Sequence, residues 1–189
     1  MTISNELRAR LARVRLLLLD VDGVMTDGRL YFDAEGRETK VFHAQDGAGL
    51  VYWKRAGFIS GFLSGRDAPA VRKRAEDLHV QELHLGKKRK IATLHEICER
   101  YGLGLDEVCY VGDDFLDLEV LRVVGVPITV PGARPQVKEV CCYVTQTPEG
   151  QGAVREIAEL LLDAKGLLDE IVACSGLPPE ALSPEEAAQ

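Results

Sequence analysis

The sequence predicts an α/β fold, a doubly wound, Rossmann-like parallel sheet with helices packed around it. Short apolar runs alternate along the chain with stretches in which apolar residues recur at helical spacing. Acidic or polar residues directly follow several of these runs, as is typical of the carboxyl ends of parallel strands. The chain has 189 residues, 46% of them hydrophobic and 28% charged, so it can bury one substantial core.

The first predicted strand is the run of leucines at residues 16–19, which is apolar enough to be buried on both faces of a sheet. Beyond it, residues 28–44 contain two short strand-like segments, at 30–32 and 40–43. The turn sequence at 33–36 separates them. This pattern predicts a β-hairpin inserted after the first strand.

Helices and strands alternate through the rest of the chain. Gly57 is suited to end the first long helix, and Pro69 is tolerated in the first turn of the next. The predicted helices cover residues 46–56, 67–78, 90–101, 116–124 and 152–164, and the further strands cover residues 58–63, 81–85, 108–111, 128–130 and 142–144.

The chain is expected to hold one domain over residues 1–170, followed by a tail over residues 171–189. From Ser175 this tail is rich in Pro and Glu and poor in large apolar groups. Such a composition buries too little apolar surface to order itself, so we expect it to be mobile unless a partner holds it.

Composition excludes several classes of protein. The formal net charge of −7 disfavours nucleic acid as a partner, because binding to phosphate backbones needs clustered cations. No apolar run approaches the roughly 20 residues of a membrane-spanning helix. The N-terminal sequence has no continuous apolar segment like that of a secretory signal, so the expected location is cytoplasmic. The five cysteines contain no CxxC pair, which disfavours a zinc site.

Four polar clusters follow successive predicted strands, and in a parallel sheet such positions can converge on one crevice. A lone DxD would equally suit an acidic turn, but four clusters favour a site. Packed carboxylates repel one another unless a cation lies among them, and an all-oxygen set suits Mg²⁺ better than zinc or copper. A hydroxyl and a lysine beside the metal would bind an anion, which predicts phosphoryl transfer. The clusters are Asp20 with Asp22, Ser64, Lys90, and Asp113 with Asp114 and Asp117.

Together these motifs resemble those of the haloacid dehalogenase superfamily: DVDGV at 20–24, SGR at 64–66, Lys90, and GDDFLD at 112–117. A closer resemblance covers most of the chain up to about residue 170. It is to the capless branch of the superfamily that acts on sugar-acid phosphates, and it implies no large cap domain and a homotetramer whose hairpins pack together. This closer resemblance is carried by DVDGVMTDG at 20–28, QDGAG at 45–49, SGRD at 64–67, VGDD at 111–114 and GQGAVRE at 150–156.

The resemblance implies a role for each residue of the site. Asp20 would be the nucleophile that forms an aspartyl-phosphate, and Asp22 the general acid and then the base that activates water. Mg²⁺ would be held by Asp20, Asp113 and the backbone carbonyl of Asp22. Ser64 and Lys90 would bind the remaining phosphate oxygens.

Other implied roles are less specific. Asp117, and equally Asp114, would orient Lys90 or a metal-bound water, or would simply be an acid at a helix start. Arg66 suits a sugar-acid carboxylate or phosphate, or a salt bridge at a helix start. Gln45 and Arg89 depart from the branch's usual residues. Substrate contacts are expected from Thr26, Asp27, Gly28, Asp46, Gly47 and Arg66.

The resemblance implies a Mg²⁺-dependent phosphomonoesterase that hydrolyses 3-deoxy-D-manno-octulosonate 8-phosphate for lipopolysaccharide precursor synthesis. Two alternatives stay open. One is a phosphatase for a nine-carbon ulosonate phosphate, a substrate that the departure at Gln45 leaves possible. The other is a non-hydrolytic relative that accepts or binds phosphate, which Asp22 disfavours because an adjacent acid/base would shorten the life of a phosphoaspartate.

Overall fold

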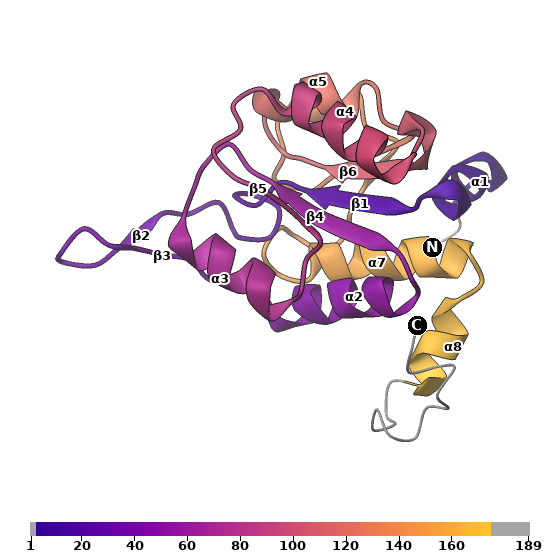
Figure 1. The fold of residues 1–189 in the computed structure, drawn as a ribbon, viewed down its shortest axis with the longest axis horizontal. Coiled ribbons are helices and arrows are strands. Elements are labelled where there is room, and N and C mark those ends of the chain that lie inside the picture. Colours follow the sequence, from indigo (N-terminus) through magenta and orange to yellow (C-terminus); the bar gives the residue numbers. More distant parts are fainter. Residues whose placement is uncertain (1–2, 175–189) are drawn as a thin grey trace.

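The computed structural model describes residues 3–174, and the tail from Ser175 lies outside that range. Its centre is a six-stranded sheet in the order β5-β4-β1-β6-β7-β8, in which every neighbouring pair is parallel (Figure 1). This confirms the predicted fold class. The strands are β1 (Leu16–Leu19), β4 (Ile59–Leu63), β5 (Glu82–His84), β6 (Val108–Val111), β7 (Val126–Thr129) and β8 (Tyr143–Val144).

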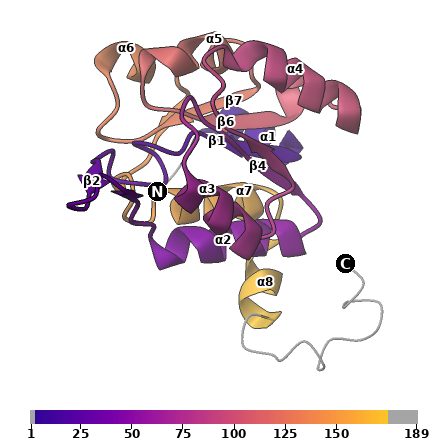
Figure 2. The ribbon, with the colours of Figure 1, turned by 60° about the vertical axis from the view of Figure 1, so that its left-hand side comes forward.

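Helices cover both faces of the sheet, giving three layers: α4, α5 and α6 lie on one side, and α2, α3 and α7 on the other (Figure 2). The helices are α1 (Asn5–Arg13), α2 (Ala44–Arg55), α3 (Pro69–Asp77), α4 (Lys90–Tyr101), α5 (Leu118–Leu121), α6 (Pro135–Lys138), α7 (Ala153–Ala164) and α8 (Leu168–Cys174), with 3₁₀ turns at Leu105–Glu107 and Phe115–Asp117.

The four leucines of β1 divide the hydrophobic core between the two faces. Leu17 and Leu19 pack into the cluster that contains Trp53 of α2, whereas Leu16 and Leu18 pack into the cluster on the other face. All four are fully buried. Alternation of side chains along a strand explains this division, and it places β1 at the centre of the molecule.

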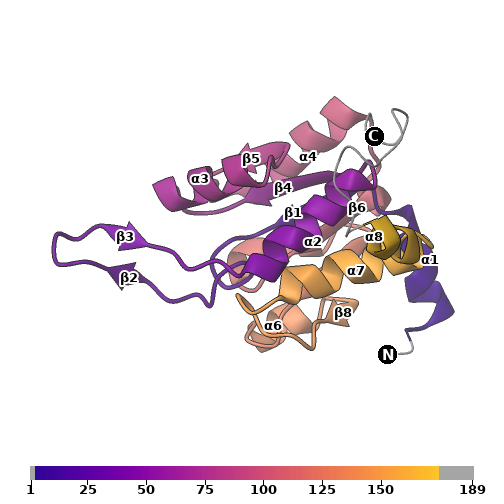
Figure 3. The same cartoon turned by 90° about the horizontal axis from the view of Figure 1, so that it is seen from below.

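A two-stranded hairpin, β2 (Tyr31–Phe32) with β3 (Glu38–Thr39), projects from the body after β1 (Figure 3). The hairpin was predicted, but its second strand was expected at 40–43, and that position is wrong. The Asp33 carboxylate accepts the N–H groups of Glu35 and Arg37, so the turn closes early and Phe32 pairs with Glu38. Residues 40–43 instead run back to the body.

Other boundaries differ for local reasons. The helix predicted over 116–124 is a 3₁₀ turn followed by the short α5, since Asp114 caps the turn through the N–H of Phe115. Helix α8 continues regular structure past residue 170, where the tail was expected to begin. Helices α1, α6 and α8 were not predicted. Among the helices of residues 3–174, none has the length and apolar character needed to cross a bilayer.

Gly150 brings the loop before α7 against the segment that follows β1. Its N–H donates to Val24 O at 3.1 Å, and a Cβ at this position would lie 2.6 Å from the backbone of Thr26 and Asp27. Its φ of +63° is also unfavourable for other residues. We therefore expect Gly150→Ala to lower the free energy of unfolding by about 3 kcal/mol in urea denaturation.

Gly102 supplies the matched control. Its φ of +61° is almost the same, but a Cβ there would have no neighbour within 4 Å. Gly102→Ala should therefore cost only the backbone strain, about 1 kcal/mol. Equal losses in the two variants would contradict the close approach at Gly150.

Candidate active site

Asp20 stands at the carboxyl end of β1, where its N–H still donates to Val111 O of β6 at 2.9 Å. The chain then turns away through Gly23, whose φ is +88°. A Cβ at Gly23 would lie 2.2 Å from Asp113 Oδ2, so a glycine is required for Asp113 to approach this loop. The ends of β1 and β6 therefore meet closely.

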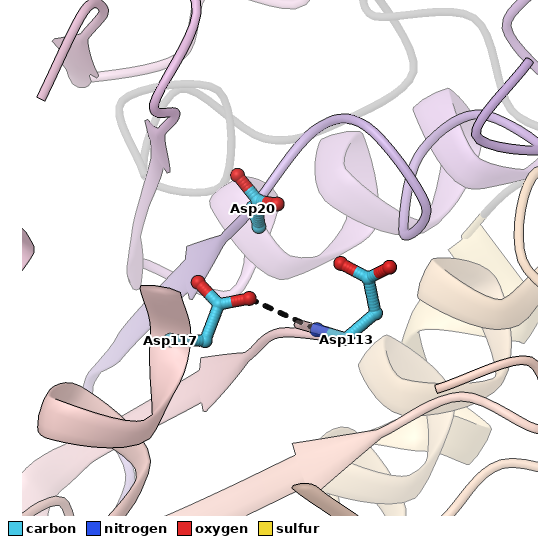
Figure 4. Close-up of side chains that lie close together, drawn as sticks. All are labelled: Asp20, Asp113 and Asp117. Carbon is cyan, nitrogen blue, oxygen red and sulfur yellow. Dashed lines mark hydrogen bonds between the residues drawn. The ribbon is translucent and has the colours of Figure 1, made fainter. Parts of the chain in front are cut away.

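Three carboxylates gather at this meeting point. Oxygens of Asp20, Asp113 and Asp117 all lie within 4.8 Å of one another (Figure 4). The sequence reasoning grouped Asp20 with Asp113, but it did not make Asp117 a ligand. The Asp22 carboxylate is outside this group, while the expected role of the Asp22 carbonyl as a metal ligand stays a prediction.

The ammonium of Lys90 is buried against this cluster. Its Nζ donates to Asp20 Oδ1 at 2.8 Å, to Asp117 Oδ1 at 2.6 Å and to the Tyr110 hydroxyl oxygen at 2.9 Å. The Tyr110 hydroxyl donates in turn to Asp117 Oδ1 at 2.6 Å. Tyr110 was not singled out from the sequence; a tyrosine within an otherwise apolar strand was the signal that could have revealed it.

Lys90 is the first residue of α4, a position that the helix dipole does not favour for a cation. Glu119 compensates, since its Oε1 accepts the backbone N–H groups of Lys90 at 2.6 Å and Ile91 at 3.1 Å. The carboxylate of α5 thus caps α4 and fixes the backbone from which the Lys90 side chain reaches the site.

One ammonium does not balance three carboxylates. Burial, reinforced by the charges of Asp20 and Asp117, raises the pKa of Asp113 to about 8. Burial also raises the pKa of Asp20 to about 6, against the lowering effect of Lys90. Burial alone would lower the pKa of Lys90, but the charges of Asp20 and Asp117 outweigh it and raise that pKa. The site therefore has an excess of negative charge.

The donor set fits Mg²⁺. Asp113 Oδ1 is buried and has no hydrogen-bond partner among the described residues, so an oxygen is left for a cation. The neighbouring ligand atoms of Asp20 and Asp117 are also carboxylate oxygens, the ligand type that Mg²⁺ prefers. Asp20 and Asp113 are the residues of this chain that would hold the ion.

The two remaining acids have different contacts. Asp117 Oδ2 accepts the N–H of Asp113 at 3.0 Å (Figure 4). It also accepts the N–H of Asp114 at 3.2 Å, while Asp117 Oδ1 accepts a hydrogen bond from Lys90. Asp114 instead accepts the N–H of Phe115 at 2.8 Å. For Asp117, these contacts favour the expected role of orienting Lys90. For Asp114, they favour the other expectation, that it is simply an acid at the start of a helical turn.

Ser64 and Arg66 lie on the turn after β4. Ser64 is buried, and its Oγ accepts the Arg66 N–H at 3.2 Å. Among residues 3–174, the Arg66 guanidinium pairs with acids of other segments and not with an acid at the helix start, the salt bridge considered from the sequence. Its Nη2 lies 2.9 Å from Glu38 of the hairpin, and its Nη1 lies 3.8 Å from Asp22 Oδ2.

Asp22 is held by a lysine that the sequence reasoning missed. Lys40, from the segment after β3, pairs with Asp22 Oδ1 and with Glu38 Oε1, and its side chain is 1% exposed. A lysine directly before the apolar pair Val41 and Phe42 was the available signal. Its burial depends on where the hairpin folds back, which no local pattern gives.

The expected substrate residues make contacts that stabilise loops. The Thr26 hydroxyl accepts the Gly28 N–H at 3.3 Å, and Asp27 accepts the Tyr31 hydroxyl at 2.8 Å. Asp46 is buried and accepts the N–H of Arg155 in the first turn of α7, at 3.0 Å, and burial raises its pKa. A Cβ at Gly47 would lie 2.3 Å from Arg74 Nη2. Substrate contacts by Thr26, Asp27, Gly28, Asp46 and Gly47 stay predictions.

Known proteins are similar to this chain. Residues 80–157 match the family of haloacid dehalogenase-like hydrolases. The chain is 36% identical over 168 residues to 3-deoxy-D-manno-octulosonate 8-phosphate phosphatase KdsC of Escherichia coli K12, covering 89% of both proteins.

Solved structures agree with this similarity. The structure of the Moraxella catarrhalis phosphatase of that name, in complex with magnesium ion, phosphate ion and KDO molecule, is 35% identical. Its TM-score is 0.89, with 92% of this chain and 99% of that chain covered. The cobalt-bound form of the Haemophilus influenzae enzyme is 31% identical, with a TM-score of 0.81 and coverage of 95% and 99%.

Mg²⁺ should stabilise the protein more at high pH than at low pH, because it competes with the proton on Asp113. The pKa of Asp113 is raised from 3.8 to about 8. Its protonation therefore stabilises the metal-free fold at low pH, and that contribution is lost as the pH rises through about 8. We expect a fixed excess of Mg²⁺ to raise the melting temperature more at about pH 8.5 than at about pH 6.

Asp113→Asn is the control for this effect, since an amide carries no titrating proton. The variant should show a smaller Mg²⁺ increment that differs less between the two pH values, because Asp20, with a pKa of about 6, is then the one titrating ligand left. A wild-type increment that is equal at the two pH values, or larger at the lower one, would contradict Asp113 as a ligand.

Proposed function

The chain belongs to the 3-deoxy-D-manno-octulosonate 8-phosphate phosphatase family of haloacid dehalogenase-like hydrolases, and we propose that it hydrolyses this sugar-acid phosphate to the free sugar acid and phosphate. The reaction would supply lipopolysaccharide precursor synthesis. The observation that carries the proposal is the buried contact of Lys90 with Asp20 and Asp117, beside the unpartnered oxygen of Asp113.

In the proposed reaction Asp20 attacks the phosphorus while the bond from phosphorus to the sugar oxygen breaks. Asp22 gives a proton to that oxygen, so the sugar leaves as a neutral alcohol. The product on the enzyme is an aspartyl-phosphate at Asp20. A water molecule then attacks the phosphorus, Asp22 takes its proton, and phosphate and the free Asp20 carboxylate are released.

The groups around Asp20 stabilise the negative charge of the phosphate and orient the reacting carboxylate. Lys90 orients the Asp20 carboxylate, and together with the Ser64 hydroxyl it binds phosphate oxygens as charge shifts onto them. Asp117 fixes the Lys90 ammonium through their contact of 2.6 Å. Bound Mg²⁺ neutralises phosphate oxygens and aligns them for in-line displacement.

Arg66 supports a sugar acid as the substrate. Its side chain is 42% exposed, so the planar guanidinium, which is paired with Glu38 and lies beside Asp22, is accessible to a substrate carboxylate. The nine-carbon alternative rests on Gln45, which departs from the residue usual in the eight-carbon branch. The cytoplasmic location stays a prediction.

We also propose that the protein assembles as a homotetramer through its hairpin. The hairpin and the segment after it expose large apolar side chains: Leu30 at 51%, Phe32 at 60% and Val41 at 60%. Apolar groups gathered on a projecting element favour burial against another copy.

The test of the substrate is phosphate release in parallel from the eight-carbon 8-phosphate and from a nine-carbon ulosonate 9-phosphate, both with Mg²⁺. We expect kcat/KM to favour the eight-carbon substrate at least tenfold, about 1.4 kcal/mol of discrimination. A preference for the nine-carbon substrate would contradict the eight-carbon proposal and favour the nine-carbon alternative. No phosphate release from either substrate would refute the phosphatase assignment.

Asp20→Asn and Asp22→Asn should each abolish phosphate release, because the first removes the nucleophile and the second removes the proton donor. Asp114→Asn is the matched control: its side chain can still cap the 3₁₀ turn, and its activity should stay within a few-fold of wild type. Circular dichroism should show the same fold in all three variants. Full activity of either of the first two would rule out the role given to that residue.

A further inference from the structure

The Lys40 ammonium is buried beside the residue that acts as acid and base in the proposed reaction. Its side chain is 1% exposed, and it pairs with Asp22 Oδ1 and, at 2.9 Å, with Glu38 Oε1. A buried ammonium is costly unless it is paired. Two carboxylates from different segments, one after β1 and one in β3, supply that pairing, so Lys40 joins the hairpin to the site.

Lys40 belongs to a charge network that differs from that of Lys90. Arg66 joins it through Glu38 Oε2, at 2.9 Å, and through Asp22 Oδ2, at 3.8 Å. Two cations therefore face two carboxylates, and the formal charges of the network cancel. Within this set, Lys40 fixes the direction of the Asp22 carboxyl group through its direct contact with Oδ1.

The two oxygens of Asp22 have different surroundings. Oδ1 is held by Lys40, whereas Oδ2 is buried and has no hydrogen-bond partner among residues 3–174. A carboxyl group that exchanges protons needs one oxygen available to the reacting group and a fixed orientation about its side-chain torsions. At Asp22 the contact with Lys40 fixes the orientation through Oδ1, and Oδ2, which has Arg66 Nη1 at 3.8 Å, is the oxygen that accepts no hydrogen bond from the described residues.

We propose that Lys40 is a positioning residue, which holds Asp22 Oδ1 and so leaves Oδ2 to exchange the proton. The inference rests on the proposed function and assigns an atom to each step. As the aspartyl-phosphate forms, the proton on Oδ2 moves to the leaving sugar oxygen while the bond from that oxygen to phosphorus breaks. In the second step Oδ2 takes a proton from the water whose oxygen bonds to phosphorus. Lys40 itself exchanges no proton.

A purely structural role for Lys40 would be to fasten the hairpin to the body. Comparing the reaction rates of substrates with different leaving groups distinguishes this structural role from the positioning of Asp22. A sugar alkoxide leaves with the help of a proton, whereas p-nitrophenolate is a stable anion that leaves without one. A misplaced Asp22 should therefore slow the sugar phosphate far more than p-nitrophenyl phosphate, whereas a loosened hairpin would slow both alike.

The experiment compares kcat/KM of the full-length protein and its Lys40→Met variant on these two substrates, with Mg²⁺. This parameter covers the steps up to release of the alcohol or phenol and excludes hydrolysis of the aspartyl-phosphate. We expect Lys40→Met to lower kcat/KM by about 100-fold for the sugar phosphate and by less than about fivefold for the aryl phosphate.

Two variants serve as controls. Glu38→Gln keeps the contact between Lys40 and Asp22, and should change the ratio of the two kcat/KM values by less than about threefold. Lys165→Met removes another partly buried lysine, which donates to Ala12 O at 2.7 Å, and should leave the ratio unchanged. Equal losses on both substrates in Lys40→Met would overturn the inference. Inactivity of the wild-type protein on both would instead overturn the proposed function.

A crystal structure of the Lys40→Met variant gives a test that does not depend on turnover. We expect the Asp22 carboxyl group to change its side-chain torsions or to take several orientations, while Asp20 and Asp113 keep theirs. An unchanged, single orientation of Asp22 would overturn the positioning role.

Discussion

The buried ammonium of Lys90, held between Asp20 and Asp117, is the contact on which the rest of the site depends. It joins the end of β1 to the start of α4 and to the turn after β6, three segments far apart in the sequence. It also determines the net charge of the site, because one ammonium does not neutralise three carboxylates and the site keeps an excess of negative charge. Burial and the neighbouring acids raise the pKa of Asp113 to about 8, so near neutral pH a divalent cation competes with a proton for this carboxylate.

The two aspartates of the DVD sequence, Asp20 and Asp22, form ion pairs in two separate charge networks. Asp20 lies in the network of Lys90, built on the sheet and α4, whereas Asp22 lies in that of Lys40, Glu38 and Arg66, built on the hairpin and the turn after β4. Each network imposes its own orientation on its carboxylate. Two aspartates separated only by Val21 can thus take different parts in one reaction, and the acid/base residue is joined to the hairpin through which we propose that the protein assembles.

The sequence predicts the sheet and the meeting of Asp20, Asp113 and Lys90 because strand ends are local features, visible in apolar runs followed by polar residues. It does not predict the burial of Lys40 or the contact of Tyr110 with Lys90, since both depend on packing between distant segments. The hairpin was foreseen but its register was not, because the Asp33 turn decides it through side-chain hydrogen bonds.

The central claim is that Asp20 is the nucleophile of a magnesium centre completed by Lys90 and Asp113. The most direct test is a crystal structure with Mg²⁺ and beryllium fluoride, a phosphoryl analogue that binds carboxylates. We predict a trifluoroberyllate bonded to Asp20, a metal ion bound by Asp20 and Asp113, and the Lys90 ammonium within hydrogen-bonding distance of a fluoride. A trifluoroberyllate bonded to Asp22, or a metal ion that Asp113 does not bind, would contradict the account.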